Sequence, residues 1–211
     1  MSDLYKASRT SHFPWSPGAT SDDKIIKNLD MFVGQYCIAS EKRDGEHTSL
    51  YSDYSHARSL DSKNHESRNW VKGLWGKIKH NIPENWRICG ENMYAKHSVG
   101  YNNLDTYFEV FSIYDENNMN LSWDSLKEWC QLLELKPVPV LWEGIFDLKT
   151  IENLHKTLDL EKQEGFVLRI ADSFHYNDYE TCVAKWVRAN HVQTDEHWMN
   201  AKVIPNKLKK E

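Results

Sequence analysis

The chain has 211 residues and a formal net charge of −5 at pH 7. This length is enough to bury one large core, and the mild acidity excludes a uniformly basic surface but leaves a local basic groove for nucleic acid open. There is no signal-peptide pattern and no apolar run of membrane-spanning length, so we expect a cytoplasmic protein without membrane contact. The four cysteines form no Cys-x-x-Cys pair, and we expect them to be reduced and buried.

Residues 1–24 are rich in Ser, Thr, Pro and Gly, and their two central prolines exclude a regular helix or a central strand. Phe13 and Trp15 would be costly to leave in water, so we expect this extension to dock on the body of the protein. Arg9 and His12 in the same stretch suit contacts with phosphate groups.

The remaining chain alternates between two periodicities. Apolar residues recur at helical spacing in the segments 22–32, 66–82, 122–135 and 147–158, and a last short helix is expected over 195–199. Strand patterns cover 33–40, 46–53, 56–60, 86–96, 107–115, 138–146, 164–170 and 182–188. Ser122 and Asp147 are expected to cap helices, and Pro137 to end one. This order predicts an α+β fold of twisted antiparallel sheets flanked by helices over residues 25–200, followed by a basic, frayed tail over 201–211.

The segment Ser-Glu-Lys-Arg-Asp-Gly at positions 40–45 lies between two of these strands. Asp-Gly between strands is a turn signal, because both residues tolerate positive φ. We therefore expect Lys42 at the end of a strand beside a tight turn, where a lysine can act as a nucleophile. Taken alone, however, Lys-x-Asp-Gly also occurs in hairpins without catalytic function.

Three other predicted strands carry polar residues of interest. Arg58 lies in the strand 56–60, among small and apolar residues. Gly90 interrupts the strand 86–96 and is followed directly by Glu91. One face of the strand 107–115 is expected to carry Tyr107, Glu109, Phe111 and Ile113.

Two strands near the C-terminal end each place a charge against apolar neighbours. Glu164 stands at the edge of the first strand, and Lys185 shares a face of the second with Val183 and Val187. A charge in the middle of an apolar face is costly unless it has a partner or lines a polar pocket. A lysine can also extend along its stem to water, so the pattern leaves both interpretations open.

Taken in chain order, these features form one set: Lys42-x-Asp-Gly, Arg58, Gly90-Glu91, the aromatic strand around Phe111, Glu164-Gly165 and Lys185. The set resembles the covalent nucleotidyltransferase superfamily, which comprises ATP-dependent DNA and RNA ligases and mRNA capping enzymes. Glu41 directly before the lysine is similar to the double-strand RNA ligases of the phage RNA ligase 2 type. The Arg-Thr-x-His-Phe-Pro-Trp-Ser stretch near the start and residues 191–198 also resemble phage and bacterial RNA ligases.

The resemblance implies a nucleotidyltransferase (adenylation) domain with an ATP-grasp-like architecture, acting as an ATP-dependent RNA ligase in phage or bacterial RNA repair. Lys42 would attack the α-phosphate of ATP and form lysyl-AMP, with Mg²⁺ or Mn²⁺ as the cation. The AMP would then move to a 5′-phosphate RNA end, and a 3′-hydroxyl would displace it.

The resemblance also implies a role for each site residue. Glu91 would contact the ribose hydroxyls and Phe111 would stack on adenine, while Glu164 would bind Mg²⁺. Lys185 would neutralise charge on the α-phosphate, and Arg58 would bind ribose or the phosphate that is joined. Further contacts are expected from Glu41, to adenine or a second metal, and from Arg9, His12 and Arg188, to the substrate.

Two departures from the family pattern are visible. Many ligases have two lysines spaced by one residue in the last motif, whereas here Trp186-Val187 follow Lys185, and Arg188 is the remaining cation, on the opposite face by strand parity. Only about a dozen residues follow His197, so we expect no C-terminal OB-fold of the DNA ligase or capping-enzyme kind. An RNA-repair partner that supplies a duplex-binding domain is one explanation.

Other interpretations remain open at this stage. A DNA ligase or DNA-tolerant ligase, a GTP-using capping enzyme and a non-catalytic RNA-end-binding module would share these motifs. His191 and His197, with Asp195 and Glu196 between them, match no standard zinc spacing, so a structural or substrate-contact role is favoured for them.

Overall fold

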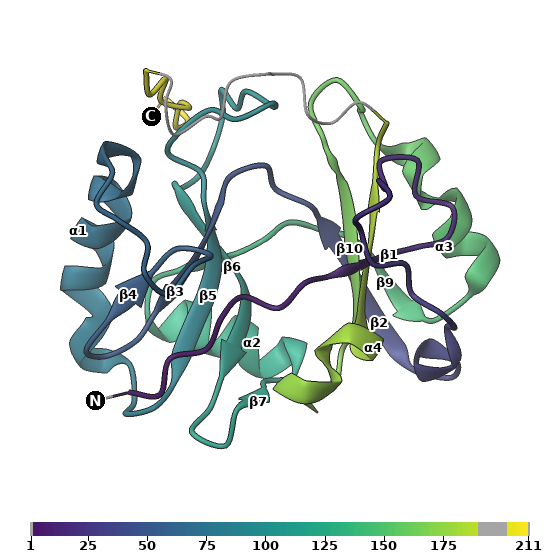
Figure 1. Cartoon of the computed structure of the whole chain (residues 1–211), viewed down its shortest axis with the longest axis horizontal. Coiled ribbons are helices and arrows are strands. Elements are labelled where there is room, and N and C mark those ends of the chain that lie inside the picture. The colour runs from purple at the N-terminus through teal and green to yellow at the C-terminus, as the bar shows by residue number, and fades with distance from the viewer. Residues whose placement is uncertain (1, 190–201, 211) are drawn as a thin grey trace.

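The computed structural model describes residues 2–189 and 202–210 of the chain, and two β-sheets dominate it (Figure 1). The first sheet has the strand order β1 (Ser11–His12), β12 (Val183–Val187), β10 (Gly165–Ile170), β2 (Tyr36–Glu41) and β9 (Val140–Ile145). The second has the order β11 (Phe174–His175), β7 (Met119–Asn120), β6 (Phe108–Tyr114), β5 (Arg87–Asn92), β3 (Glu46–Leu50) and β4 (Ser55–His56), and β8 (Lys136–Pro137) also pairs with β6. All pairings except β1–β12 and β6–β8 are antiparallel. The α+β prediction with antiparallel sheets is confirmed.

The helices are α1 (Asn69–Ile78), α2 (Trp123–Leu132), α3 (Leu148–Leu154) and α4 (Tyr179–Cys182), and short 3-10 helices cover Asp30–Phe32, Glu66–Arg68, Lys79–Asn81, His155–Thr157 and Tyr176–Asp178. Helices α1 and α3 lie on the outer sides of the two sheets in Figure 1, and α2 and α4 lie towards the bottom of the view. No helix of the described segments is long and apolar enough to span a bilayer. One buried cluster forms around the first sheet and α3, and a second lies between the other sheet and helices α1 and α2. Each sheet thus packs one face on helices, and residues of both sheets line a cavity between them.

The two predicted helix caps, Ser122 and Asp147, are confirmed. The side chain of Ser122 accepts a hydrogen bond from the amide of Ser125, and Asp147 does the same for Thr150, so both cap their helices. Helix α2 ends at Leu132, earlier than predicted, because Glu134 adopts a left-handed conformation with φ 55°. Pro137 belongs to β8 instead of terminating the helix.

Two predicted elements are wrong. The helix expected over 22–32 is reduced to one 3-10 turn, because the amides of His12 and Ile26 pair the two segments like strands: His12 donates to Lys24 at 2.7 Å and Ile26 donates to His12 at 2.9 Å. The strand expected over 56–60 ends at His56, so Arg58 lies in the following loop.

A β-bulge changes the face assignment on β6. The pairing of β5 with β6 shifts between Cys89 and Gly90, which leaves Phe111 as an extra residue on β6. Phe108 and Ile113 therefore face the same core cluster, although five residues separate them, whereas Phe111 lines the cleft. The prediction that Phe111 and Ile113 share a face is wrong, because alternation restarts at the bulge.

Residues 2–10, which we call the N-terminal strap, cross from one sheet to the other in Figure 1. In the middle of the strap the amide of Tyr5 donates to the Tyr51 hydroxyl at 3.0 Å. The Tyr176 hydroxyl donates to the carbonyl of the next residue, Lys6, at 2.7 Å. The chain then enters β1, and Phe13 is completely buried. The segment before Asp22 is thus part of the sheet and the core.

The C-terminal residues 202–210 pack against the loop that follows β5, so the prediction of a frayed tail is wrong. Asn206 is 4 % exposed. Its amide group donates to the Met93 carbonyl at 2.7 Å, and its oxygen accepts from the Tyr101 amide at 2.9 Å. These hydrogen bonds satisfy buried backbone groups of the loop and fix the tail there.

All four cysteines are buried and unpaired, as predicted. Burial raises the pKa of the Cys37 and Cys130 thiols to about 12, and it also raises the pKa of Cys89 and Cys182.

Candidate active site

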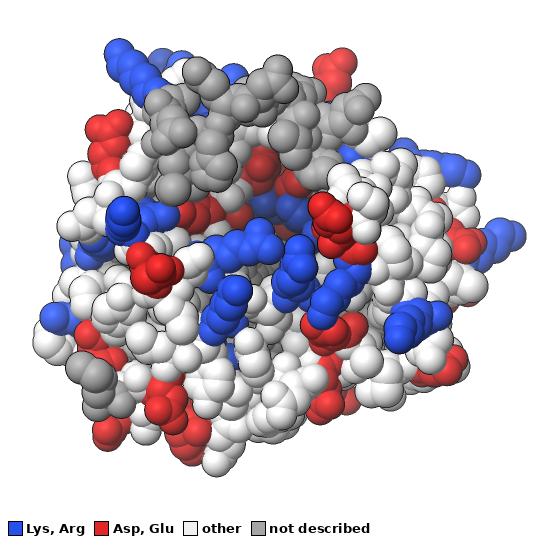
Figure 2. All heavy atoms as spheres, viewed as in Figure 1, with Lys and Arg blue, Asp and Glu red and all other residues white. Residues whose placement is uncertain are grey.

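A cavity of about 1130 Å³ lies between the two sheets and is lined from both of them and from the N-terminal strap. Figure 2 shows Lys and Arg side chains gathered around this hollow, with acidic side chains between them. The overall charge of the chain is negative, so the cavity is a local basic groove with carboxylates inside it.

Lys42 lies directly after β2, where the chain leaves the first sheet for the second. Its amide donates to the Gly165 carbonyl at 2.9 Å, and its Nζ donates to Glu164 Oε2 at 2.5 Å. Burial lowers the pKa of this amine, but the carboxylates of Glu164, Glu91 and Asp44 outweigh that effect and raise the pKa above its usual value. Lys42 is therefore an ammonium group, fixed by an ion pair inside the cavity.

Arg43, the variable residue of Lys-x-Asp-Gly, joins two buried carboxylates. Its Nη1 donates to Glu41 Oε1 at 2.6 Å, its Nε to Glu109 Oε2 at 2.6 Å, and its Nη2 to Glu109 Oε1 at 3.0 Å. The other oxygen of Glu41 accepts from Gln163 Nε2 at 3.0 Å. Both oxygens of Glu41 are thus engaged. Sequence reasoning missed Arg43, because the pattern treats its position as free.

The turn after Arg43 is held by side chains. Asp44 accepts from the Val99 amide at 2.6 Å, and Glu91 accepts from the Gly45 amide at 3.2 Å. Burial raises the pKa of Glu91 to about 8; Lys42 opposes this shift, while Glu164 and Asp44 add to it. Glu91 therefore holds a proton up to a higher pH than an ordinary carboxyl group, and it contacts the turn that follows the lysine.

Lys185 on β12 lines the cavity with Val183 and Val187, the two residues predicted to share its face. Burial lowers the pKa of Lys185, and the neighbouring charges of Lys42 and Arg58 lower it further. Of the two interpretations left open, the structure thus favours a lysine that lines a polar pocket. Arg58 also lines the cavity.

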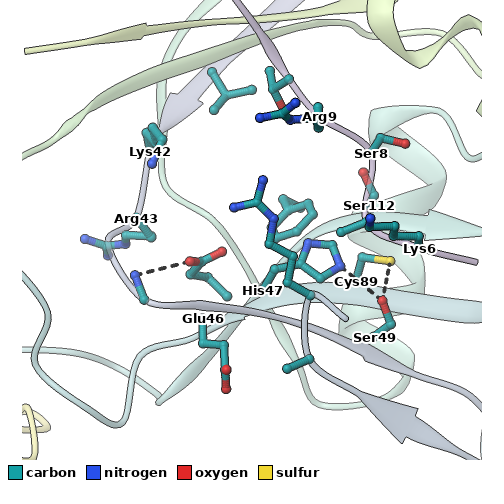
Figure 3. Close-up of a pocket in the computed structure, with 18 of the residues that line it drawn as sticks. Lys6, Ser8, Arg9, Lys42, Arg43, Glu46, His47, Ser49, Cys89 and Ser112 are labelled. Carbon is teal, nitrogen blue, oxygen red and sulfur yellow. Dashed lines mark hydrogen bonds between the residues drawn. The ribbon is translucent and has the colours of Figure 1, made fainter. Parts of the chain in front are cut away.

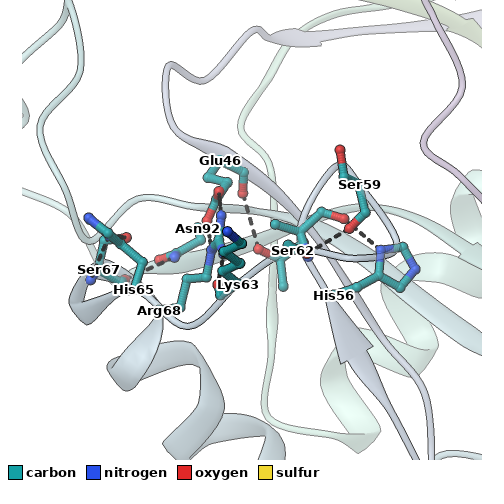
Figure 4. Close-up of polar contacts among 11 residues, drawn as sticks. Glu46, His56, Ser59, Ser62, Lys63, His65, Ser67, Arg68 and Asn92 are labelled. Carbon is teal, nitrogen blue, oxygen red and sulfur yellow. Dashed lines mark hydrogen bonds and ion pairs between the residues drawn. The ribbon is translucent and has the colours of Figure 1, made fainter. Parts of the chain in front are cut away.

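The loop that carries Arg58 is held by a polar network (Figure 4). The Ala57 amide donates to Ser62 Oγ at 2.9 Å, and that hydroxyl donates to the Ser59 carbonyl at 2.6 Å. Arg68 donates from Nε to Glu46 Oε2 at 2.7 Å and forms a second bond to the same carboxylate. The network fixes the loop on the strand β3.

Phe111 packs against His47 at the wall of the cavity, with ring centroids 5.4 Å apart. His47 pairs with Glu91 across the β3–β5 register, and its Nε2 lies 3.1 Å from Ser49 Oγ (Figure 3). Burial and the nearby cations lower the pKa of His47 to about 3, so the ring is neutral. Sequence reasoning missed His47. The available signal in the sequence was its position two residues after Gly45, in the predicted strand 46–53.

The three residues predicted to contact substrate are placed differently. Arg9 lies on the strap and points into the cavity (Figure 3). His12 is buried and outside the cavity lining, with Nδ1 2.8 Å from Ser16 Oγ and Nε2 3.7 Å from Asp23 Oδ2. Arg188 is half-buried and also outside the lining. The interpretation of His12 as a phosphate ligand is therefore not supported, whereas Arg9 stays a prediction. His191, Asp195, Glu196, His197 and the helix expected over 195–199 lie outside the described residues.

The described residues contain no group of three or more His, Cys, Asp or Glu side chains that could hold a metal ion. Mg²⁺ is commonly bound through one or two carboxylates together with substrate phosphates and water. Glu164, with Glu91 and Asp44 nearby, supplies hard oxygen donors of this kind. The residues present thus fit a divalent cation that arrives with a phosphate-bearing ligand.

Comparisons with known proteins place this geometry in a family context. The family model for RNA ligases matches residues 35–187, which contain each predicted site residue except Arg9, His12 and Arg188. No curated protein sequence matches the chain.

Solved structures share the fold at low identity. They include a Naegleria gruberi RNA ligase with pyrophosphate (TM-score 0.55, 18 % identity, covering 88 % of this chain and 61 % of that one). An archaeal ATP-dependent RNA ligase gives a TM-score of 0.54 at 14 % identity, covering 84 % and 48 %. The Aquifex aeolicus protein that carries the provisional name of ATP-dependent DNA ligase gives 0.57 at 16 % identity, covering 88 % and 50 %. The chain thus spans at most 61 % of the length of these proteins.

Proposed function

Because the chain belongs to the RNA ligase family, we propose that it is an ATP-dependent RNA ligase that joins 5′-phosphate and 3′-hydroxyl ends through AMP bound covalently to Lys42. The observation that carries the proposal is the position of Lys42. Its amine lies in a cavity between two sheets, 2.5 Å from the buried Glu164 carboxylate. It is also close enough to Lys185 to lower the pKa of Lys185. A surface lysine of a hairpin would have neither partner.

In the proposed first step, the Lys42 nitrogen forms a bond to the α-phosphorus of ATP, and the bond from that phosphorus to the β-phosphate oxygen breaks, releasing pyrophosphate. The amine must be neutral to attack, yet its ion pair with Glu164 keeps it protonated. A divalent cation held by Glu164 and the phosphates would neutralise phosphate charge and weaken this ion pair, which would lower the pKa of Lys42 so that its proton leaves to water before the attack. Lys185 would stabilise the charge that develops on the α-phosphate.

The base and the sugar would occupy the wall opposite Lys185. Phe111, backed by the neutral ring of His47, offers an aromatic face for adenine. Glu91 is placed to bind the ribose hydroxyls, and its raised pKa lets it donate as well as accept hydrogen bonds. Both oxygens of Glu41 are engaged by Arg43 and Gln163, which favours a positioning role for Glu41 over metal binding.

The nucleic-acid end would enter past Arg9 and Arg58, the two arginines that line the cavity from the strap and from the loop after β4. We infer from the RNA ligase family that RNA is the substrate and that an RNA-repair partner supplies a duplex-binding domain. A cytoplasmic, phage or bacterial setting is part of the same proposal. DNA is the second candidate substrate, favoured by the similarity to the Aquifex aeolicus protein.

The test is intact-protein mass spectrometry after incubation with ATP and Mg²⁺. We expect the wild type to gain the mass of one AMP group and Lys42→Ala to gain none. Lys127→Ala is the matched control, because Lys127 is exposed on α2, outside the cavity lining, and pairs with Asp124 at 2.8 Å. A wild type without the adduct, or an adduct that persists in Lys42→Ala, would overturn the proposal.

Further arms define the substrate. GTP in place of ATP tests the capping-enzyme alternative, and nicked RNA, nicked DNA and single-stranded RNA ends test the acceptor. Formation of the AMP adduct without joining of any end would favour a protein that needs the duplex-binding partner. Binding of RNA ends without the adduct would favour the non-catalytic alternative.

A further inference from the structure

Two buried arginines lie at the end of the cavity far from Lys42. Arg87 begins β5 and is 2 % exposed, and Arg169 on β10 is 5 % exposed. Both line the cavity, and they come from opposite sheets. Glu91 and Gly165, which contact the Lys42 turn, stand four residues away along the same two strands. At about 3.3 Å per residue this separation is about 13 Å.

Each of these arginines has a buried nitrogen without a hydrogen-bond partner among the described residues: Nη2 of Arg87 and Nη1 of Arg169. The other groups of Arg169 are engaged, since Nε donates to the Ile170 carbonyl at 3.0 Å and Nη2 to the Leu121 carbonyl at 2.7 Å. Within residues 2–189 and 202–210, neither guanidinium forms an ion pair with a carboxylate. The contrast is Arg68, which is also buried, at 8 % exposed, but is paired with Glu46.

Aromatic rings hold the two guanidinium groups without neutralising them. Arg87 lies over the ring of Tyr114 at 3.7 Å and over that of Tyr5 at 4.4 Å. Arg169 lies 5.2 Å from the ring of Phe174. Such contacts orient a cation and recover part of its lost hydration, but a buried charge with a free donor remains costly. The site is thus pre-organised for an anion.

Phosphate fits this arrangement better than carboxylate. The guanidinium fork matches phosphate oxygens, and two forks from opposite sheets can grip one tetrahedral group. Burial raises the pKa of Tyr114 well above its usual value, so its hydroxyl stays a donor beside both arginines. Lys6, Arg9 and Arg58 line the same cavity. These additional cations suit a ligand with several phosphates.

We propose that Arg87, Arg169 and Tyr114 form an inner anion subsite that binds a phosphate group, about 13 Å along the strands from the adenylation lysine. The phosphate belongs either to the nucleic-acid strand or to a free nucleotide. Only the assignment to the strand rests on the proposed function, whereas phosphate binding itself does not.

The direct test is a crystal of the protein soaked in sodium tungstate, whose anomalous signal locates a phosphate-like anion. We expect a peak within hydrogen-bonding distance of Arg87 Nη2 and Arg169 Nη1, in the wild type and in Lys42→Ala. Peaks only beside Lys185, or none in the cavity, would overturn the proposal. If the peak is present while the wild type forms no AMP adduct, the subsite stands and the ligase proposal fails.

The solution test compares Arg87→Met with Arg68→Met, using thermal unfolding with and without inorganic phosphate. Arg68→Met breaks a buried ion pair, so it should lower the Tm but keep the phosphate-induced rise. Arg87→Met removes an unpaired charge, so it should lower the Tm less and weaken the Kd for phosphate at least about tenfold. Arg169→Met should also weaken phosphate binding, and it replaces Arg87→Met if that variant folds poorly. An unchanged phosphate-induced rise in Tm in both Arg87→Met and Arg169→Met would refute the subsite.

The source of the phosphate follows from two titrations of Arg87→Met. Weaker binding of a 5′-phosphorylated RNA strand, with ATP binding as in the wild type, assigns the subsite to the strand. Weaker binding of ATP, with RNA binding unchanged, assigns it to the nucleotide. Unchanged binding of both ligands would contradict the proposal.

Discussion

Replacing Arg43 with methionine tests how the Lys42 turn is held. The guanidinium is the shared partner of Glu41 and Glu109, whose side chains are 9 % and 5 % exposed. Without it, two buried carboxylates face each other unpaired. Breaking a buried ion pair by removing one partner typically costs about 3–5 kcal/mol, because the remaining charge stays desolvated. We take about 3 kcal/mol, since Gln163 still supports Glu41.

For a chain of this size, each kcal/mol lowers the Tm by about 2–4 °C, so Arg43→Met should unfold about 6–12 °C below the wild type. Calorimetry and urea unfolding measure this directly. The double variant Arg43→Met/Glu109→Gln should recover part of the loss, because it removes one of the stranded charges. Lys127→Met, which breaks an exposed pair, is the control and should change stability by less than about 0.5 kcal/mol.

Two results would refute this reasoning. One is a loss of less than about 1 kcal/mol in Arg43→Met, which would mean that the carboxylates are hydrated or already protonated. The other is a double variant no more stable than the single one. Because Arg43 adjoins Lys42, slower attachment of AMP in Arg43→Met is expected as well.

Other predictions concern the same turn and its sheet. The pKa of Glu91 is about 4.3 in the unfolded chain and about 8 in the folded one, so the folded state binds the proton more tightly. The free energy of unfolding should therefore fall as the pH rises from about 4.3 to about 8, by at most about 1.4 kcal/mol per pH unit. Glu91→Gln should remove this fall in urea unfolding at pH 5 to 9, and an unchanged pH profile would contradict it. Gly165→Ala would bring a Cβ within 2.0 Å of the Trp186 carbonyl oxygen and should cost more than about 3 kcal/mol. Gly73→Ala on α1, with nothing within 4 Å, should instead gain up to about 1 kcal/mol, and equal effects of the two would refute the close approach of β10 and β12.

Much of the fold follows from local signals. Ser122 and Asp147 cap their helices because capping depends on residues three positions apart. The order of the motifs places Lys42, Glu164 and Lys185 in one cavity, since each stands on or beside a strand of the same sheet.

What the sequence did not predict depends on distant partners. The bulge opposite Gly90 turns Ile113 away from Phe111, because the pairing of two strands, and not the alternation of one, fixes the face. Arg43 looked variable because its carboxylate partners include Glu109, sixty-six residues away. The sequence suggested His12 as a phosphate ligand, but its ring is buried beside the Ser16 hydroxyl, a contact that the sequence pattern does not reveal.

The burial of every cysteine has a practical consequence for observing the strap. Thiols react as thiolates, and at neutral pH the raised pKa of Cys37 and Cys130 leaves almost none. A single cysteine placed at the exposed Asp3 would therefore take up a maleimide dye alone, without removal of the native thiols. Its fluorescence would report whether the strap stays in place while nucleotide and strand enter the cleft.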